Sequence, residues 1–573
     1  MSLKVCFVVY DNGSYDNIFP MGIGALAAIV KEKGHDIKIW HQDIHHYEDE
    51  ELTPYLDKHK FDIVILSLIG GYYQYQKMLG ISKAINASKH RPFYAMGGYG
   101  PTPEPKYFLD KSGCDVVCMG EGETTISKLL ESVEKKLPLK DVPGVAWLEN
   151  GELKTTQRAP LINDLSALPR IPYELFPMNI YRMMRSPKCS ITDFCFPLMT
   201  ARGCTFKCTF CYRMDPGYRK RDPEELLDEV EMLHKTYGIT RFSFQDDLLM
   251  ASVEHTENVC KAMLKRNLPI TWDCMGRLNY CSKELLQLMK DAGCVFIIYG
   301  IESMDQKVLN NMKKGLRPEI IIRGIEQTFE VGISPGFNFI YGNRGDSRKT
   351  LEKAVDFLIK YDDFSEKRTI RPVTPYPGSP LYYDAIESGL LDKERPVADF
   401  YENKHLNSDL LCCNFTEQTD KEFYETLKWA NKKLMKNYYE KSSASTQNQI
   451  DHLYDNLDAS FRGFRHQGGK SDGSVSAEES FRKNGKKKPK LVNWENTLNK
   501  DADADRFLQN SFNTESQEKS IQSYYDYLER KKARLKEKNA SKIPAQTASE
   551  KDVASKNILN IDPKSKGFAV KVD

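Results

Sequence analysis

Short hydrophobic runs alternate with helix-like segments over the first part of the chain. Residues 22–33 place small and apolar side chains at helical intervals, and Gly34 ends that pattern. The strand-like runs are Val5–Tyr10, Ile37–Trp40, Ile63–Leu68, Pro92–Met96 and Asp115–Met119. Because strands that alternate with helices usually form parallel sheets, we predict a doubly wound α/β domain here. Such sheets bind ligands beyond the carboxyl ends of their strands, which is where this chain gathers its glycines.

The alternation resumes with longer helices between Phe196 and Pro380. The strand-like runs are Phe196–Thr200, Arg241–Gln245, Ile270–Met275, Val295–Gly300, Gly336–Tyr341 and Thr369–Val373. The helix-like segments between them are Pro223–His234, Val253–Lys265, Lys283–Asp291, Pro318–Val331 and Ser347–Tyr361. Asp222 is expected to cap the helix that starts at Pro223, a residue suited to a first helical turn. The six repeats predict a second α/β unit.

The remaining segments differ in composition from these two units. Residues 136–190 contain several prolines and a possible hairpin across Asn150 and Gly151, so we expect a connector there. Residues 396–441 mix aromatic and acidic side chains, and we expect them to close the second unit and shape a substrate pocket. Beyond Ser442 large aliphatic residues become sparse, which predicts a mostly disordered polar tail over 442–573.

Composition excludes some classes of function. The 573 residues carry 82 basic and 80 acidic side chains, so no global charge favours nucleic acid. Fourteen cysteines lack the spacing of a disulfide framework, and no signal peptide precedes Lys4, so we expect a cytoplasmic protein. The apolar run Ile63–Ile69 is far shorter than the ~20 residues of a membrane span, so no membrane partner is expected.

Three cysteines lie close together just after the strand-like run 196–200. Cys204, Cys208 and Cys211 have the spacing C-x3-C-x2-C, and no fourth cysteine follows at a comparable interval. Cysteine thiolates are the usual protein ligands of iron–sulfur clusters, so three of them would leave one iron open to another ligand. Two alternatives are ordinary buried cysteines and a zinc site, although structural zinc is usually closed by four ligands.

With Phe210 just before the third cysteine, this motif resembles that of the radical S-adenosylmethionine (SAM) superfamily. The resemblance implies a partial (β/α)6 TIM-like barrel and a [4Fe–4S] cluster whose open iron binds SAM and cleaves it to a 5′-deoxyadenosyl radical. It also implies a set of SAM-binding residues near the strand ends: Phe210, Gln245, Asp246, Arg277, Glu302, Ser303 and Asn338. The sequence Gly342–Asp346 departs from the pattern of the family, because Arg344 stands where proline is common.

The first unit resembles the cobalamin-binding domain of the flavodoxin-like, or Rossmann-like, type. That family carries D-x-H-x-x-G, then S-x-L, then G-G, and this chain has Pro20 and Gly22 where the first aspartate and histidine belong. The resemblance therefore implies cobalamin without a protein histidine on cobalt. Its binding residues are expected to be Gly22, Ser67, Leu68, Gly70, Gly97, Gly98, Gly120, Glu121, Gly122 and Glu123. A flavodoxin-like domain without cobalamin is the alternative.

The expected domains are cobalamin-binding (1–135), connector (136–190), radical SAM barrel (191–395), barrel-closing segment (396–441) and tail (442–573). The two resemblances together imply a cobalamin-dependent radical SAM enzyme that methylates an unactivated carbon of a small molecule. A reductant of the flavodoxin or ferredoxin type is the expected partner, and no catalytic residue beyond the cluster is assigned. The alternatives are an oxidative cyclase or rearrangement enzyme of the same branch, and a corrinoid or iron–sulfur sensor without catalysis.

Overall fold

A computed structural model describes residues 2–13, 17–190, 192–405 and 407–455, and all of these belong to one compact unit, Met1–Asn513. The expected tail beyond residue 455 lies outside the described residues. Among the described helices, none has the length and apolar character that crossing a membrane requires.

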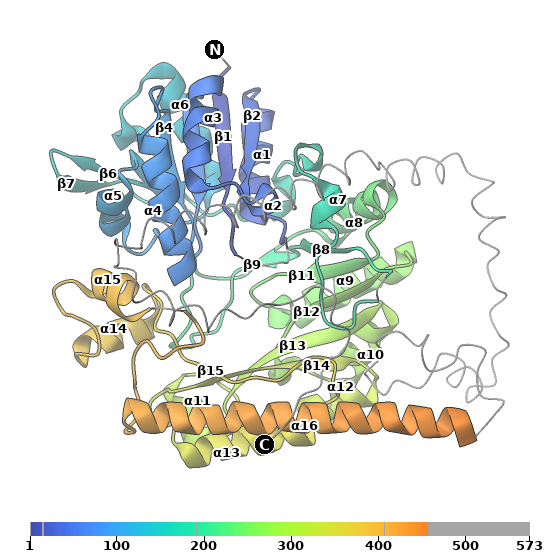
Figure 1. Ribbon diagram of the computed structural model, residues 1–573. Coiled ribbons are helices and arrows are strands. Elements are labelled where there is room, and N and C mark those ends of the chain that lie inside the picture. Colours follow the sequence, from blue (N-terminus) through green and yellow to red (C-terminus); the bar gives the residue numbers. More distant parts are fainter. Residues whose placement is uncertain (1, 14–16, 191, 406, 456–573) are drawn as a thin grey trace, which may run out of the picture. The chain divides into compact units, whose positions relative to one another are not determined.

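The first sheet has the strand order β2-β1-β3-β4-β5-β6-β7 (Figure 1). Its strands are β1 Lys4–Val9, β2 Asp36–His41, β3 Ile63–Ser67, β4 Phe93–Gly97, β5 Val116–Cys118, β6 Val145–Glu149 and β7 Glu152–Thr155. The first five strands are parallel, whereas β6 and β7 form an antiparallel hairpin at the edge. The predicted doubly wound sheet is confirmed, and it also includes the hairpin that the sequence placed in the connector.

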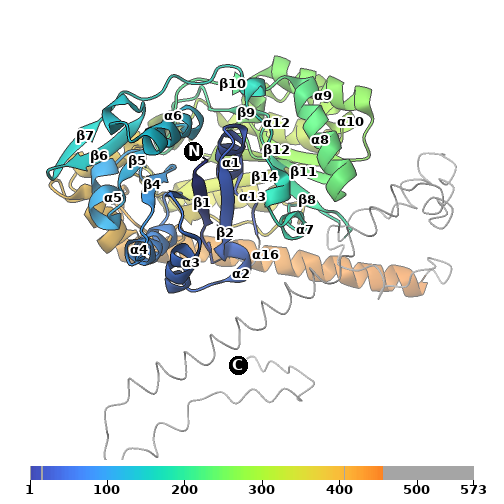
Figure 2. The ribbon, with the colours of Figure 1, turned by 90° about the horizontal axis from the view of Figure 1, so that it is seen from above.

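Helices cover both faces of this sheet (Figure 2). They are α1 Met21–Glu32, α2 Gln42–His45, α3 Leu52–His59, α4 Tyr72–Asn86, α5 Pro105–Ser112 and α6 Gly122–Lys135. Because side chains alternate along a strand, Val5 and Phe7 of β1 belong to the core that includes α1 and α6. Cys6 and Val8 belong to the opposite core, which includes α3, α4 and α5.

The second sheet has the order β15-β14-β13-β12-β11-β8, and all of its neighbouring strands are parallel. The strands are β8 Cys195–Leu198, β11 Arg241–Phe244, β12 Thr271–Gly276, β13 Cys294–Glu302, β14 Ser334–Tyr341 and β15 Arg371–Pro372. The helices are α7 Met178–Tyr181, α8 Pro223–Tyr237, α9 Val253–Arg266, α10 Lys283–Asp291, α11 Gln306–Asn311, α12 Pro318–Glu330 and α13 Arg348–Lys360. The predicted six-stranded partial barrel is confirmed. A small ladder that the sequence did not predict, β9 Ala201–Arg202 with β10 Arg219–Lys220, follows β8.

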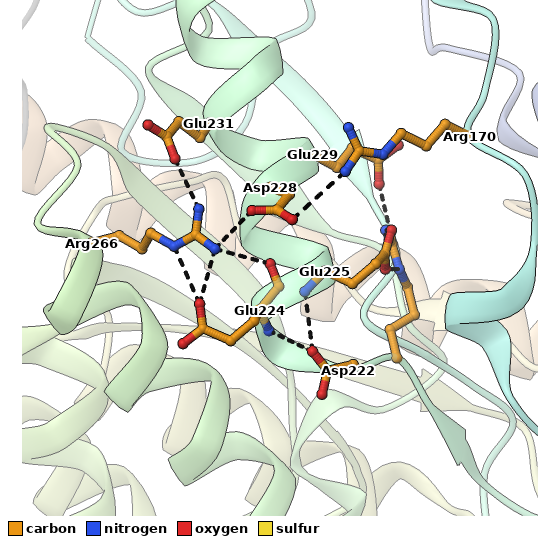
Figure 3. Close-up of polar contacts among 9 residues, drawn as sticks. Arg170, Asp222, Glu224, Glu225, Asp228, Glu229, Glu231 and Arg266 are labelled. Carbon is orange, nitrogen blue, oxygen red and sulfur yellow. Dashed lines mark hydrogen bonds and ion pairs between the residues drawn. The ribbon is translucent and has the colours of Figure 1, made fainter.

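Helix α8 begins as its sequence predicts. The carboxylate of Asp222 accepts hydrogen bonds from the backbone nitrogens of Glu224 (3.0 Å) and Glu225 (3.1 Å), directly ahead of Pro223 (Figure 3). Arg266 at the end of α9 pairs with acidic side chains along the exposed face of α8, so the two neighbouring helices are linked at the surface. Such exposed pairs contribute about 0–1 kcal/mol each.

The segment after the barrel forms α14 Pro380–Glu387, α15 Pro396–Ala398, a π-helical turn Asp399–Lys404 and α16 Asp420–Asp455. Helix α16 runs alongside α13 (Figure 1) and buries Phe423, Leu427 and Leu434 against the barrel. It continues past Ser442, where the sequence predicted the start of the tail, so residues 442–455 are helical in the structure. Extending a helix costs much less than nucleating one, and the buried first half of α16 supplies the nucleus.

Candidate functional site

The three motif cysteines lie in one loop, residues 203–218, which we call the cluster loop. The ladder of β9 and β10 closes its base, and its backbone is fixed at Thr209. The nitrogen of Thr209 donates to the carbonyl of Met312 (3.0 Å), and its carbonyl accepts from the nitrogen of Leu381 (2.9 Å). The cluster loop is therefore attached both to the turn after α11 and to the start of α14.

Asp246 holds the strand that leads into the cluster loop. One of its carboxylate oxygens accepts the backbone nitrogens of Thr200 (2.6 Å) and Ala201 (3.0 Å), and the other accepts the hydroxyl of Thr200. Burial raises the pKa of Asp246 to about 6, although these donors act in the opposite direction. Because both oxygens are engaged, this geometry supports a structural role for Asp246 rather than the SAM contact expected from the sequence.

Two cations lie beside the thiols of the cluster loop. The hydrogen bond with Cys211 lowers the pKa of Cys208 to about 6, against burial, and Lys314 and Arg277 act in the same direction. The same hydrogen bond raises the pKa of Cys211, and burial raises that of Cys204. A positive charge close to several thiols stabilises the thiolate form, which is the form that binds iron.

Arg277 and Lys314 are themselves fixed by aromatic rings and by each other. The guanidinium carbon of Arg277 lies 3.4 Å from the ring centroid of Phe206, and an Arg277 nitrogen donates to the carbonyl of Lys314. The ammonium of Lys314 lies 5.6 Å from the ring centroid of Phe210. Two aromatic residues of the cluster loop, Phe206 and Phe210, thus contact the two cations beside its cysteines.

The end of β13 presents a buried ion pair to the inside of the barrel. The ammonium of Lys314 lies 2.9 Å from a carboxylate oxygen of Glu302, and both side chains are buried. A Cβ at Gly300 would lie 2.6 Å from that oxygen and 2.9 Å from the lysine nitrogen, so a larger residue there would displace the pair from this position. Glu302 itself has φ +69°, an unfavourable region for a residue with a side chain, and such strain often occurs at functional sites.

Other expected SAM-binding residues lie on the same barrel face. Phe337 and Phe339 pack on Phe357 of α13, so Asn338 between them points away from the helices and is exposed. Its register partner on β13 is Gly300. Ser303 is buried next to Glu302, and its hydroxyl accepts from the backbone nitrogen of Asp305 at 3.1 Å.

Gln245 is also exposed at the end of its strand. It is fixed through its amide nitrogen, which donates to the hydroxyl of Ser243 (2.7 Å), and that hydroxyl in turn donates to Asp273 (2.6 Å). Of the expected SAM-binding residues, Gln245, Arg277, Glu302 and Ser303 lie at the ends of barrel strands, Asn338 lies within β14, and Phe210 lies in the cluster loop beside Lys314. Their contacts with SAM remain predictions.

Sequence reasoning missed Lys314, whereas Asn343, just past the strand-like run Gly336–Tyr341, was expected near the adenine of SAM. Asn343 follows β14 and is 2% exposed, and within the described residues neither its amide oxygen nor its nitrogen has a hydrogen-bond partner. A buried amide without a partner is costly, so this one fits a bound group that both donates and accepts, as the adenine of SAM does. In the sequence Lys314 is part of the turn Lys313–Lys314–Gly315, which resembles an ordinary exposed turn.

The arrangement of the three cysteines is compatible with an iron–sulfur cluster. Within the described ranges, no group of three or more His, Cys, Asp and Glu side chains is gathered closely enough to bind one metal ion. A [4Fe–4S] cluster takes one thiolate on each of several separate irons, so its ligands need not converge on one point. The arrangement of three thiols in one loop with two adjacent cations fits that cluster.

The carboxyl ends of β3 and β4 form the expected cobalamin site. Ile69 and Tyr99 follow these strands and are 65% and 44% exposed, although both have large apolar side chains. A Cβ at Gly70 would lie 3.5 Å from the backbone of Gly100, so the two loops approach closely. Exposed apolar side chains beside bare glycine backbone fit a large, flat, mostly apolar ligand such as a corrin.

Gly98 in this edge cannot be replaced without strain. Its φ is +101°, and a Cβ there would lie 2.5 Å from the carbonyl oxygen of Leu68. We expect Gly98→Ala to lower the free energy of unfolding by about 1–3 kcal/mol and to weaken cobalamin binding, as measured by denaturant titration and hydroxocobalamin binding. Gly22→Ala is the control for stability alone, because a Cβ on Gly22 of α1 meets nothing within 4 Å, although Gly22 is itself an expected cobalamin residue. Equal stability of the two variants would contradict this reading.

The remaining expected cobalamin residues are placed as follows. Gly22 is exposed in the first turn of α1, Ser67 ends β3, and a Cβ at Gly97 would lie 3.5 Å from Cys118. Gly120 has φ +87° and is followed by Gly122 at the start of α6. Glu121 and Glu123 of this turn, in contrast, pair with arginines of the cluster-loop ladder.

The two expected sites meet through a pair of aromatic side chains. Tyr99 follows β4 of the first sheet, and Tyr212 follows Cys211 in the cluster loop. Their ring centroids are 6.0 Å apart with perpendicular planes. A Cβ at Gly378 would lie 2.6 Å from the ring of Tyr212 and 2.9 Å from Pro103, so the loops after β4 and β15 also meet here.

Comparison with known proteins agrees with both resemblances. Residues 198–358 match the Radical SAM superfamily, and residues 12–130 match the B12 binding domain. The chain is 29% identical to a protein from Pyrococcus horikoshii named as an uncharacterized methyltransferase, PH0819, over 65% of this chain and 79% of the relative. It is 25% identical to cytidylyl-2-hydroxyethylphosphonate methyltransferase of Streptomyces wedmorensis, over 66% of this chain and 80% of the relative.

Solved structures share the fold. The cobalamin-dependent SAM radical enzyme OxsB, with aqua-cobalamin and SAM bound, superposes with a TM-score of 0.60 at 17% identity, covering 92% of this chain and 81% of that one. The radical SAM methyltransferase TsrM from Kitasatospora setae, with cobalamin and a [4Fe–4S] cluster bound, has a TM-score of 0.56 at 18% identity, covering 68% and 75%. The chain is therefore a radical SAM enzyme with an N-terminal B12-binding domain, and its cofactors are a [4Fe–4S] cluster, SAM and cobalamin.

Proposed function

We propose that this enzyme methylates an unactivated carbon of a small molecule. The contact between Tyr99 and Tyr212 carries the proposal, because it brings the expected cobalamin edge directly against the cluster loop. The cofactors supply hydrogen abstraction and methyl donation when bound, and the protein supplies their relative position. The names of the two methyltransferase relatives support the same reaction class.

The residues of the chain have distinct parts in this proposal. Cys204, Cys208 and Cys211 hold the cluster, and the inward-facing Gln245 and Asn338 contact SAM. Substrate binds beside the edge formed by Ile69 and Tyr99, whose exposed apolar side chains would be covered by cobalamin and substrate together. A small protein of the flavodoxin or ferredoxin type supplies the electron.

Product analysis tests the reaction. The full chain, loaded with cluster and hydroxocobalamin, is incubated with SAM carrying a deuterated methyl group and a chemical reductant. We expect both 5′-deoxyadenosine and S-adenosylhomocysteine, because methyl transfer requires one SAM as methyl source and one as radical source. The label should then leave SAM and appear in the methylated product.

The alternatives give other products. A cyclase or rearrangement enzyme of this branch would form 5′-deoxyadenosine without S-adenosylhomocysteine. That reading has some support, because the chain is 23% identical to the anaerobic magnesium-protoporphyrin IX monomethyl ester cyclase of Synechocystis over 52% of this chain and 59% of the relative. Formation of 5′-deoxyadenosine without S-adenosylhomocysteine, in a sample with intact cobalamin, would contradict the proposed methyl transfer and favour a cyclase or rearrangement reaction.

A further inference from the structure

The turn Gly120–Glu123 of the B12-binding domain faces the base of the cluster loop. Glu121 and Glu123 pair there with Arg202 of β9 and Arg219 of β10, and we call these four residues the clamp. We propose that Glu121 and Glu123 position the cluster loop on the B12-binding domain instead of contacting the corrinoid. They are positioning residues, since neither touches a cysteine.

The contacts within the clamp are short and shielded from solvent. Arg219 donates to both carboxylate oxygens of Glu121, at 2.9 Å for one of them, and so forms a two-pronged pair. Arg202 lies 2.6 Å from Glu123 and 3.3 Å from Glu121. All four side chains are less than one-fifth exposed. Two-pronged pairs between arginine and carboxylate are geometrically specific, so the clamp fixes orientation as well as distance.

The ladder needs these carboxylates for its own stability. Arg202 and Arg219 are register partners across β9 and β10, directly opposite each other at the base of the cluster loop. Like charges in that position repel and destabilise a strand pair. Glu121 lies against both guanidinium groups and neutralises the repulsion. Without it, two buried arginines would face each other where the loop must close.

The charge balance of the clamp agrees with this role. Burial opposes the charge on Glu121, but Arg219 and Arg202 outweigh it and hold the pKa of its carboxyl below its usual value. Burial also opposes the charge on Arg202, and Glu123 and Glu121 raise its pKa in compensation. Glu121 therefore stays ionised near neutral pH, and each carboxylate of the clamp is paired with an arginine.

The connector reinforces the same junction. Arg219 also donates to the carbonyl of Ile162 (2.9 Å), and Arg158 donates to the carbonyl of Met214 within the cluster loop (2.7 Å). The cluster loop is thus held from one side by the barrel, through Asp246 and Asp247, and from the other by the B12-binding domain and connector. The position of its thiols depends on both attachments.

The first test removes the negative charges. Glu121→Gln with Glu123→Gln, in the full chain loaded with cluster, should lose iron to a chelator on the order of tenfold faster than wild type. Hydroxocobalamin affinity should stay within about twofold, because cobalamin does not contact these side chains. The matched control is Glu131→Gln on α6, whose carboxylate makes only exposed pairs with Lys128 and Lys135. Weaker cobalamin binding with unchanged iron loss would overturn the proposal.

The second test restores the charges in exchanged positions. Glu121→Arg alone places three arginines together and should release iron fastest. Glu121→Arg with Arg219→Glu rebuilds an attractive pair, and it also sets a glutamate opposite Arg202, so retention of iron should return to near wild type. Hydrogen exchange should rise over residues 203–218 in the single variant and fall again in the double variant.

Exchange in the barrel strands, unchanged throughout, would show that the variants are folded. A double variant no better than the single one would overturn the proposal. Both tests read iron retention, backbone exchange and cobalamin binding rather than products. If no methyl transfer is observed, the proposal about the clamp still stands. If the clamp variants behave like wild type, the proposed reaction class still stands.

Discussion

Replacing Cys208 by alanine is expected to remove the visible absorbance of the iron–sulfur cluster and to reduce 5′-deoxyadenosine formation to background. Cys208 is the thiol nearest to ionisation in the cluster loop, and Lys314 and Arg277 stabilise its thiolate. With only three candidate thiolates in the loop, loss of any one leaves an iron without its protein ligand. Iron and sulfide analysis with an assay of SAM cleavage, both without oxygen, measures the effect.

Cys189→Ala provides the matched control for this substitution. Cys189 is a partly buried thiol outside the cluster loop, 2.9 Å from the sulfur of Cys195. Its removal should leave iron content and SAM cleavage unchanged. An intact cluster in Cys208→Ala, or zinc instead of iron on the wild-type cysteines, would contradict the assignment of the loop.

Replacing Lys314 by methionine should give the next largest effect. The substitution leaves Glu302 buried and negatively charged without its partner, and breaking such a pair costs about 3–5 kcal/mol of folding free energy. It also removes a positive charge from beside the cluster thiolates, which makes adding an electron less favourable. We expect the reduction potential of the cluster to fall by on the order of tens of millivolts, as measured by redox titration.

Two comparisons separate these effects. Lys313→Met changes the exposed neighbouring lysine and should alter neither stability nor potential. Adding Glu302→Gln to Lys314→Met removes the stranded negative charge, so it should restore part of the stability and also return the potential part of the way towards wild type. Equal stability of the Lys313 and Lys314 variants would show that the ion pair between Lys314 and Glu302 contributes nothing to the free energy of unfolding.

The sequence predicts the strands well because their hydrophobic runs are dictated by burial. Helix Lys283–Asp291 was predicted at its exact bounds, and most other elements lie within a few residues of their expected positions. Burial in a parallel sheet requires continuous apolar runs, and the breaks between them carry glycine or proline. The cysteine motif is equally local, since all three ligands lie within one short loop.

Contacts between distant segments could not be predicted in this way. Lys314 comes from the turn after α11, and only the folded chain brings it into a buried pair with Glu302 at the end of β13, beside Gly300. The ladder of β9 and β10 is too short to show a periodic pattern. Glu121 and Glu123 occur in a turn that resembles a ligand-binding motif, and only the fold brings Arg202 and Arg219 to them.

The hydrogen bonds of Asn431 on α16 cover part of the open border of the barrel sheet. The side-chain amide of Asn431 accepts from the nitrogen of Ile370 (2.9 Å) and donates to the carbonyl of the same residue (3.0 Å), just ahead of the terminal strand β15. An open sheet border offers such peptide groups to the border of another molecule. Here the amide of Asn431 pairs with both peptide groups of Ile370 as a neighbouring strand would, so a helix far along the chain blocks strand addition at that residue.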